Sequence, residues 1–219
     1  IVIDSNSNDN TIKICKQNKI RIYNNKFINQ AKQMNWALKN VPIKTKWIFR
    51  IDADEIVENS FFNKVGYLIE YKKNISGILI ERKIKFLNKI INYGLTSPHK
   101  TLRIWRNGYC KYQNLNVDEQ AEVKGKIYLS NAIIIDHNLK SFYWWLNKHN
   151  DYARRETKNY FLYKNKNKTK KITLNDMSKV KQNKKFSIYY KFPIFIRPVI
   201  LFLYSYFFKL GFLSGVRGL

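Results

Sequence analysis

Apolar and polar positions along the first fifty residues predict strands and helices in turn. Apolar runs predict strands at residues 1–4, 20–23 and 47–51, and amphipathic segments between them predict helices at about residues 10–18 and 30–39. Strands that alternate with helices at this spacing are typical of a parallel sheet with helices on its faces. This part of the chain therefore predicts an α/β fold.

The pattern changes after residue 52. A helix is expected at residues 61–71, and three extended runs predict mixed or antiparallel strands at residues 77–86, 101–106 and 132–135. A longer helix rich in aromatic residues is expected at residues 142–163. We therefore expect a mixed sheet flanked by helices within a domain at residues 1–163.

The rest of the chain differs in composition from this domain. Residues 164–185 are rich in Lys and low in complexity, which is typical of a solvated linker. Residues 186–219 are dense in Phe, Ile, Leu and Tyr, but charged residues interrupt them well before the roughly 20 residues that span a bilayer. We expect a helical segment at the surface of an anionic membrane, with packing into a core or an oligomer as the alternative.

The chain is strongly basic, with 41 Lys and Arg against 15 Asp and Glu and a net charge of +26 over 219 residues. Two explanations of this charge are equally good. One is a coding bias toward Lys and Asn, and the other is attraction to nucleic acid or to an anionic membrane. No zinc-finger, KH-type, RNP-type or helix-turn-helix pattern is evident, so we expect no nucleic-acid partner. The two cysteines, Cys15 and Cys110, are too few for a disulfide framework and indicate a reducing compartment.

Three of the fifteen acidic residues cluster directly after one predicted strand. The stretch WIFRIDADE, residues 47–55, runs from apolar side chains into Asp52, Asp54 and Glu55. In α/β folds, ligands bind at the carboxyl ends of strands. Mg²⁺ and Mn²⁺ are commonly held by one or two carboxylates together with substrate phosphates. A solvated acidic turn is the alternative, but like charges this close repel one another unless a cation is present.

The first predicted strand also ends in a carboxylate. Asp4 and Ser5 follow the apolar residues 1–3, and the polar turn after them leads into the first predicted helix, which Asp9 or Asn10 can cap. An ordinary strand, turn and cap accounts well for Asp9 and less well for Asp4.

The motifs of this chain resemble those of family 2 glycosyltransferases of the GT-A fold, most closely the bacterial enzymes that build lipopolysaccharide core and other surface glycans. The resemblance rests on IVIDSNSNDNT at residues 1–11, QAKQMNWAL at 30–38, WIFRIDADE at 47–55, LRIWRNGYCKYQNLNVDEQ at 102–120, AIIIDHN at 132–138, WWLNKHNDYARRE at 144–156 and RPVILFLYSYFFKLGFLSGVRGL at 197–219. These matches follow the order of the family and cover nearly the whole chain.

The resemblance implies transfer of a sugar from a nucleotide-diphosphate donor to an acceptor hydroxyl, with inversion, in the synthesis of lipopolysaccharide-type glycans or glycolipids. It also implies a Mn²⁺ or Mg²⁺ cofactor and a place on the inner face of the cytoplasmic membrane. The implied donor-binding residues are Asp4, Ser5, Asp52, Asp54, Arg103 and Arg106; the implied metal ligands are Asp54, Asp52 and His137. Glu119 is the implied catalytic base, with Asp118 as the alternative. His137 is equally compatible with an ordinary strand end, and a regular strand turns Arg103 and Arg106 to opposite faces, so we expect only one of them to reach the site.

Several positions depart from the family pattern. Asp118-Glu119 stands where His-Glu is usual, Met34 replaces a Lys, and Ser214 replaces an Asp. The first strand and nucleotide-binding loop of the family are expected before Ile1, so part of the donor pocket is expected outside this chain. A non-catalytic, membrane-associated relative of the transferases is therefore the alternative function.

Overall fold

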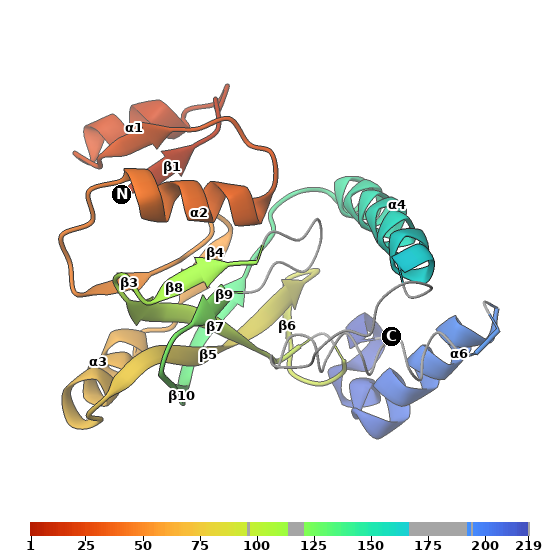
Figure 1. Ribbon diagram of the computed structural model, residues 1–219. Coiled ribbons are helices and arrows are strands. Elements are labelled where there is room, and N and C mark those ends of the chain that lie inside the picture. The colour runs from red at the N-terminus through yellow and green to blue at the C-terminus, as the bar shows by residue number, and fades with distance from the viewer. Residues whose placement is uncertain (96, 114–120, 167–191, 194, 219) are drawn as a thin grey trace.

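The strands form one six-stranded sheet and two two-stranded sheets in the computed structural model (Figure 1). The structure describes residues 1–95, 97–113, 121–166, 192–193 and 195–218, so the expected linker at residues 164–185 lies largely outside the described residues. Four helices flank the sheets: α1 (Thr11–Gln17), α2 (Gln30–Asn40), α3 (Phe61–Tyr71) and α4 (Phe142–Lys166).

The N-terminal strands form a small parallel sheet. Strand β1 (Val2–Asp4) pairs with β2 (Ile22–Asn24), and α1 connects the two strands. This arrangement confirms the expected β-α-β pattern for the first two strands. The third strand, β3 (Trp47–Phe49), does not join them and instead pairs antiparallel with a strand of the larger sheet.

The larger sheet is mixed and has the strand order β3-β7-β5-β10-β4, with β6 paired to β5. Its other strands are β4 (Glu55–Val57), β5 (Ile75–Phe86), β6 (Lys89–Ile91), β7 (His99–Arg106) and β10 (Lys126–Asp136). Strands β5 and β10 run parallel to each other, and the remaining pairs are antiparallel. The mixed sheet expected from the second part of the chain is confirmed.

The main core lies between this sheet and α3. Alternate residues of β5, Ile78 and Ile80, are fully buried, as are Phe61 of α3 and Ile134 of β10. Burying one such side chain contributes roughly 1.5–3 kcal/mol. This core fixes the strands whose ends carry the acidic residues.

A second, smaller core joins α2 to the two-stranded sheet of β8 (Cys110–Tyr112) and β9 (Ala121–Val123). The Asn35 side chain makes two hydrogen bonds with the backbone of Tyr112, donating to its carbonyl and accepting from its N–H, both at 2.8 Å. Ala31 and Trp105 are buried beside this pair. Asn35 therefore fixes Tyr112 of β8 relative to α2.

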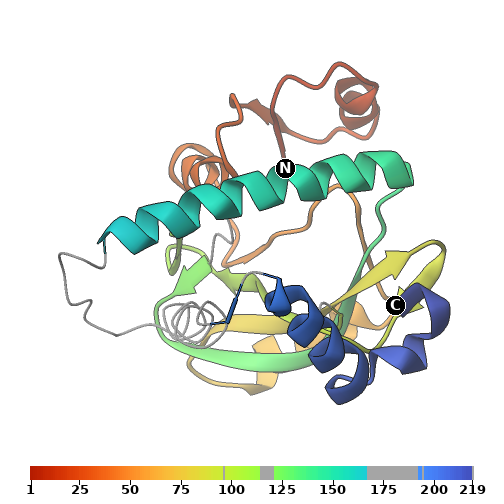
Figure 2. The same cartoon turned by 90° about the vertical axis from the view of Figure 1, so that its right-hand side faces the viewer.

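Helix α4 and the C-terminal helices lie on the same side of the molecule (Figures 1 and 2). Trp145 packs on Phe86 of β5 with 5.5 Å between the ring centroids. The C-terminal segment consists of α6 (Ile196–Leu203), η2 (Tyr204–Phe208) and η3 (Gly211–Gly218). Among the described helices, none combines the length and the apolar character that crossing a membrane requires.

The C-terminal helices attach to the loop after β6 through polar contacts. The Ser214 hydroxyl accepts a hydrogen bond from the Tyr93 N–H at 3.2 Å, and the Ser205 hydroxyl accepts one from the Leu95 N–H at 3.2 Å. The Gly94 N–H donates to the Lys209 carbonyl at 3.0 Å. These contacts place the aromatic segment against the mixed sheet.

Candidate functional site

A cleft of about 1460 Å³ lies between the N-terminal sheet and the larger sheet. Residues of β1, α2 and β3 line its walls, and Lys148 and Tyr152 line it from α4. The loop that follows β3 also lines the cleft, and it carries Asp52 and Asp54. The acidic cluster therefore lies at the carboxyl end of a strand and lines this cleft.

The acidic loop is a tight turn between two short strands. Strand β3 ends at Phe49, two residues earlier than expected, and Glu55 already begins β4. The Glu55 N–H donates to the Asp52 carbonyl at 3.0 Å, and the Glu55 carboxylate accepts the Asp52 N–H, also at 3.0 Å. This double contact fixes the turn and the direction of the Glu55 carboxylate.

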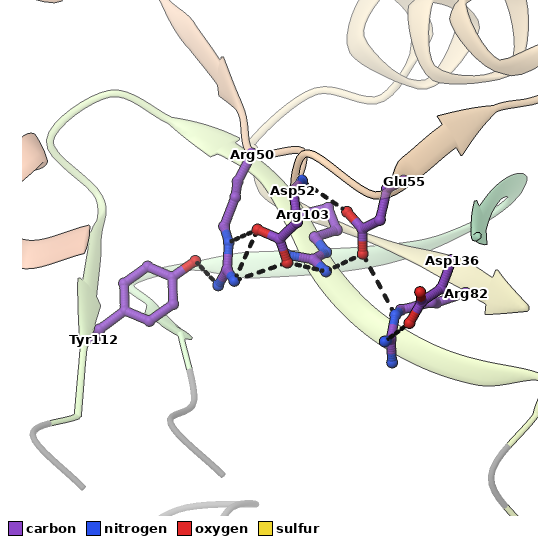
Figure 3. Close-up of polar contacts among 7 residues, drawn as sticks. All are labelled: Arg50, Asp52, Glu55, Arg82, Arg103, Tyr112 and Asp136. Atoms are coloured by element: carbon purple, nitrogen blue, oxygen red, sulfur yellow. Dashed lines mark hydrogen bonds and ion pairs between the residues drawn. The ribbon is translucent and has the colours of Figure 1, made fainter. Parts of the chain in front are cut away.

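Alternating positive and negative side chains continue from this turn across the sheet (Figure 3). Arg50 holds the Asp52 carboxylate with two hydrogen bonds of 3.1 Å, and Arg103 donates to the same carboxylate at 3.1 Å. Arg103 also pairs with Glu55. Arg82 then bridges Glu55, at 3.4 Å, and Asp136 of β10.

The charges of this network shift the pKa of its carboxyl groups in opposite directions. Burial works to raise the pKa of Asp52, but the guanidinium groups of Arg103 and Arg50 outweigh it and lower that pKa. Glu55 has a side chain only 1% exposed, and there burial prevails over the nearby arginines and raises the pKa. Asp52 is therefore held as a carboxylate, and the guanidinium groups of Arg50 and Arg103 are already paired with it.

Asp54 and His137 meet at the edge of the sheet. Strands β4 and β10 pair with Glu55 opposite Asp136, and the His137 N–H donates to the Asp54 carbonyl at 2.7 Å. The Asp54 side chain is exposed, and its carboxylate has no hydrogen bond or ion pair with any described residue. Two predicted ligands from distant parts of the sequence therefore lie on neighbouring residues in space.

Asp4 and Ser5 lie at the end of β1, on the other side of the cleft. The Asp4 carboxylate is buried and accepts hydrogen bonds from the Ser7 hydroxyl at 2.5 Å and the Ser7 N–H at 3.1 Å, which lower its pKa. The Ser5 hydroxyl lines the cleft and accepts a hydrogen bond from the Gln33 amide at 3.0 Å. Ser5 therefore faces the cleft, whereas the carboxylate of Asp4 is bound by its own turn.

The two arginines of β7 point to different places. Arg103 has no partner on β5, because β5 pairs Ile78 with Ile104 and the next residue with Leu102, and such a bulge redirects a side chain. Arg103 reaches the acidic loop, whereas Arg106 lies at the opposite end of β3. There it donates to the Ile75 carbonyl at 2.6 Å and stacks on Trp47. Of these two arginines, Arg103 contacts the acidic cluster and Arg106 does not. The predicted base Glu119 and its alternative Asp118 lie outside the described residues.

Comparison with known proteins agrees with this geometry. The family model for glycosyl transferase family 2 matches residues 1–119, which include the cleft-lining strand ends and the acidic loop. The chain belongs to this family. Its mixed sheet flanked by helices is consistent with the GT-A fold of these glycosyltransferases. No curated protein matches the chain.

The divalent metal implied by the family can be tested against the residues of this glycosyltransferase. No group of three or more His, Cys, Asp or Glu side chains in the described ranges is arranged to hold a metal, and Asp52 is already paired with two arginines. The free carboxylate of Asp54 remains, with the half-buried His137 beside it. This fits a cation that binds one carboxylate and completes its coordination with substrate phosphates.

Several residues of the site were not predicted from the sequence. They are Arg50, Arg82, Tyr112 and Asp136, together with the structural role of Glu55. Arg50 carried a signal, because it is the one charged residue inside the apolar run before Asp52. Arg82 joins the site through the pairing of β5 with β10, and Tyr112 joins it through its hydrogen bonds with Asn35 of α2. Both contacts span long sequence distances, which no local pattern reveals.

Proposed function

We propose that this glycosyltransferase moves a sugar from a nucleotide-diphosphate donor to a hydroxyl of a cell-surface glycan or glycolipid, with inversion at the anomeric carbon. The observation that carries the proposal is the free carboxylate of Asp54 in the cleft, next to His137. The nucleotide is proposed to bind in the cleft between the two sheets, which is lined by Ser5 on one wall and by the acidic loop on the other.

Asp54 and His137 are the proposed ligands of Mn²⁺ or Mg²⁺. When bound, such a cation neutralises the charge that grows on the diphosphate leaving group. Asp52 orients the cationic groups around it, because Arg50 and Arg103 occupy its carboxylate. This differs from the direct metal contact that the sequence motif implies for Asp52.

Inversion in one displacement needs a base on the face of the sugar opposite the leaving group. Glu119 is the proposed base, on the strength of its place in the family motif, with Asp118 as the alternative. Both lie in the part of the chain that the structure leaves undescribed, so their role rests on the sequence alone.

A transfer assay with nucleotide sugars and glycolipid acceptors tests this function. We expect Glu119→Gln to abolish transfer but to preserve binding of the nucleoside diphosphate. The exposed Glu70 of α3 offers a matched control, and Glu70→Gln should retain transfer. Full activity of Glu119→Gln would contradict the assignment of the base, and absence of nucleotide binding by the wild type would favour a non-catalytic module.

The C-terminal segment is proposed to bind the surface of an anionic membrane, which places the cleft near a lipid-linked acceptor. Phe195 and Phe208 are 90% and 79% exposed, and other apolar side chains of α6, η2 and η3 are exposed with them. Large contiguous apolar surfaces on a folded protein mark sites of interaction. The net charge of +26 favours an anionic partner for this surface.

A further inference from the structure

Arg50 is a cationic residue directly before the acidic loop. It lies between apolar residues in the run before Asp52, yet its side chain lines the cleft together with Asp52 and Asp54. Arg50 directly follows β3 and its side chain is largely buried, and a buried charge needs a partner or a ligand. Arg50 has two partners in the structure, and neither uses the whole guanidinium group.

Two residues hold the Arg50 guanidinium in place (Figure 3). Its Nε and Nη2 atoms donate to the two oxygens of Asp52, and its Nη1 atom donates to the Tyr112 hydroxyl at 3.2 Å. Tyr112 is itself held by the Asn35 amide. The guanidinium is therefore oriented before any ligand arrives.

Part of this guanidinium remains available for a ligand. A guanidinium carries five N–H donors, and three of those on Arg50 go to the described acceptors, Asp52 and Tyr112, which leaves two. The Arg50 side chain is 15% exposed, and it lines the cleft beside the Asp52 side chain, which is 35% exposed. Planar guanidinium groups match the oxygens of phosphates in pairs.

We propose that Arg50 binds the diphosphate of the donor through its two remaining N–H groups, an inference that rests on the proposed function. Asp52 and Tyr112 act as positioning residues that aim Arg50 into the cleft. Arg50 then supplies positive charge to the diphosphate independently of a cation at Asp54. Part of the affinity for the nucleotide should consequently persist without metal.

Calorimetric titration of the full chain with UDP, UMP and uridine, each in EDTA and in Mn²⁺, tests this inference. We expect Arg50→Leu to weaken UDP binding about tenfold or more in both conditions, to weaken UMP less, and to leave uridine unchanged. Arg50→Lys should bind UDP with intermediate affinity, because it keeps the charge but loses the paired donors. Arg154 of α4 is exposed and lies outside the cleft lining, so Arg154→Leu is the matched control.

The outcomes separate this inference from the proposed function. Unchanged UDP affinity in Arg50→Leu, with Mn²⁺-dependent binding lost in Asp54→Asn, would overturn the role of Arg50 and leave the proposed function intact. An equal loss for uridine and UDP would show that Arg50 only maintains the fold of the cleft, and would overturn the inference as well. Binding of neither UDP nor GDP by the wild type under any condition would contradict both proposals.

Discussion

The His137 N–H donates a hydrogen bond to the Asp54 carbonyl at 2.7 Å, which ties the end of β10 to the acidic loop after β3. The bond follows from the antiparallel register of β4 and β10, in which Glu55 lies opposite Asp136. This register places the backbone of His137 beside Asp54, whose free carboxylate lines the cleft.

Glu55 is expected to be the residue of the network on which stability depends most. Its buried carboxylate contacts Arg103, Arg82 and the Asp52 N–H, so Glu55→Gln leaves two arginines with weaker compensation. We expect the free energy of unfolding to fall by about 2 kcal/mol. Denaturation in urea measures this change.

Glu58 provides the comparison for that experiment. It pairs with Lys64 at 2.7 Å in a more exposed setting, and such pairs contribute about 1 kcal/mol or less. Its carboxylate also accepts the Ile133 N–H, a bond that an amide oxygen retains. If Glu58→Gln destabilised the protein as much as Glu55→Gln, the central place of Glu55 would be refuted.

The Ser7 hydroxyl should make stability depend on pH through Asp4. It donates to the ionised Asp4 carboxylate and lowers its pKa in the folded protein. Its contribution is therefore present above the unfolded Asp pKa of about 3.9 and lost as pH falls through the lower folded value. We expect Ser7→Ala to cost about 1 kcal/mol at neutral pH and progressively less in acid.

Urea denaturation between neutral and strongly acidic pH measures that loss. The same substitution in an Asp4→Asn background is the control, since without the carboxylate its effect should not change with pH. A cost of Ser7→Ala that stayed constant in the native background would be the contrary result.

Local sequence patterns predicted most of the helices and strands of the fold. The helix at residues 61–71 has the predicted bounds, because its apolar face packs on the buried strand β5 and its pattern is strong. Strands β4, β6, β8 and β9 were not predicted, since each has three residues and depends on a paired neighbour rather than on its own pattern. The separation of β3 from β1 also arises from pairing, with β7 as the partner of β3.

The site was predictable where its residues lie close together in sequence. The run WIFRIDADE placed Asp52 and Asp54 at a strand end, and the structure puts that strand end in the cleft. The pairing of Asp52 with two arginines was not predicted, because Arg103 reaches it only through a bulge between β5 and β7. The same holds for Tyr112, whose hydroxyl meets Arg50 across 62 residues of sequence.

The exposed phenylalanines of the C-terminal segment should govern binding to anionic membranes. Each exposed Phe that enters the lipid interface contributes about 1.5 kcal/mol or more, so Phe195→Ala with Phe208→Ala should weaken binding at least tenfold. Sedimentation with vesicles of phosphatidylglycerol and phosphatidylcholine, at low and high salt, measures this effect.

Tyr67 and Tyr71 of α3 provide the matched control for the vesicle experiment, because they are also exposed but lie on another element. The double change Tyr67→Ala with Tyr71→Ala should leave sedimentation unchanged. Equal binding of all variants, or binding that ignores the phosphatidylglycerol content, would refute a membrane surface at α6, η2 and η3.

Calorimetric titration of UDP and GDP, with and without Mn²⁺, on the wild type and on Asp54→Asn tests the central claim most directly. We predict that Mn²⁺ strengthens binding of one of the two nucleotides to the wild type, and that Asp54→Asn loses this gain. Asp151→Asn, which removes an exposed carboxylate of α4, should retain the gain. A gain from Mn²⁺ that is equal in Asp54→Asn and the wild type, or no effect of Mn²⁺ on either, would contradict a metal-assisted donor site at Asp54.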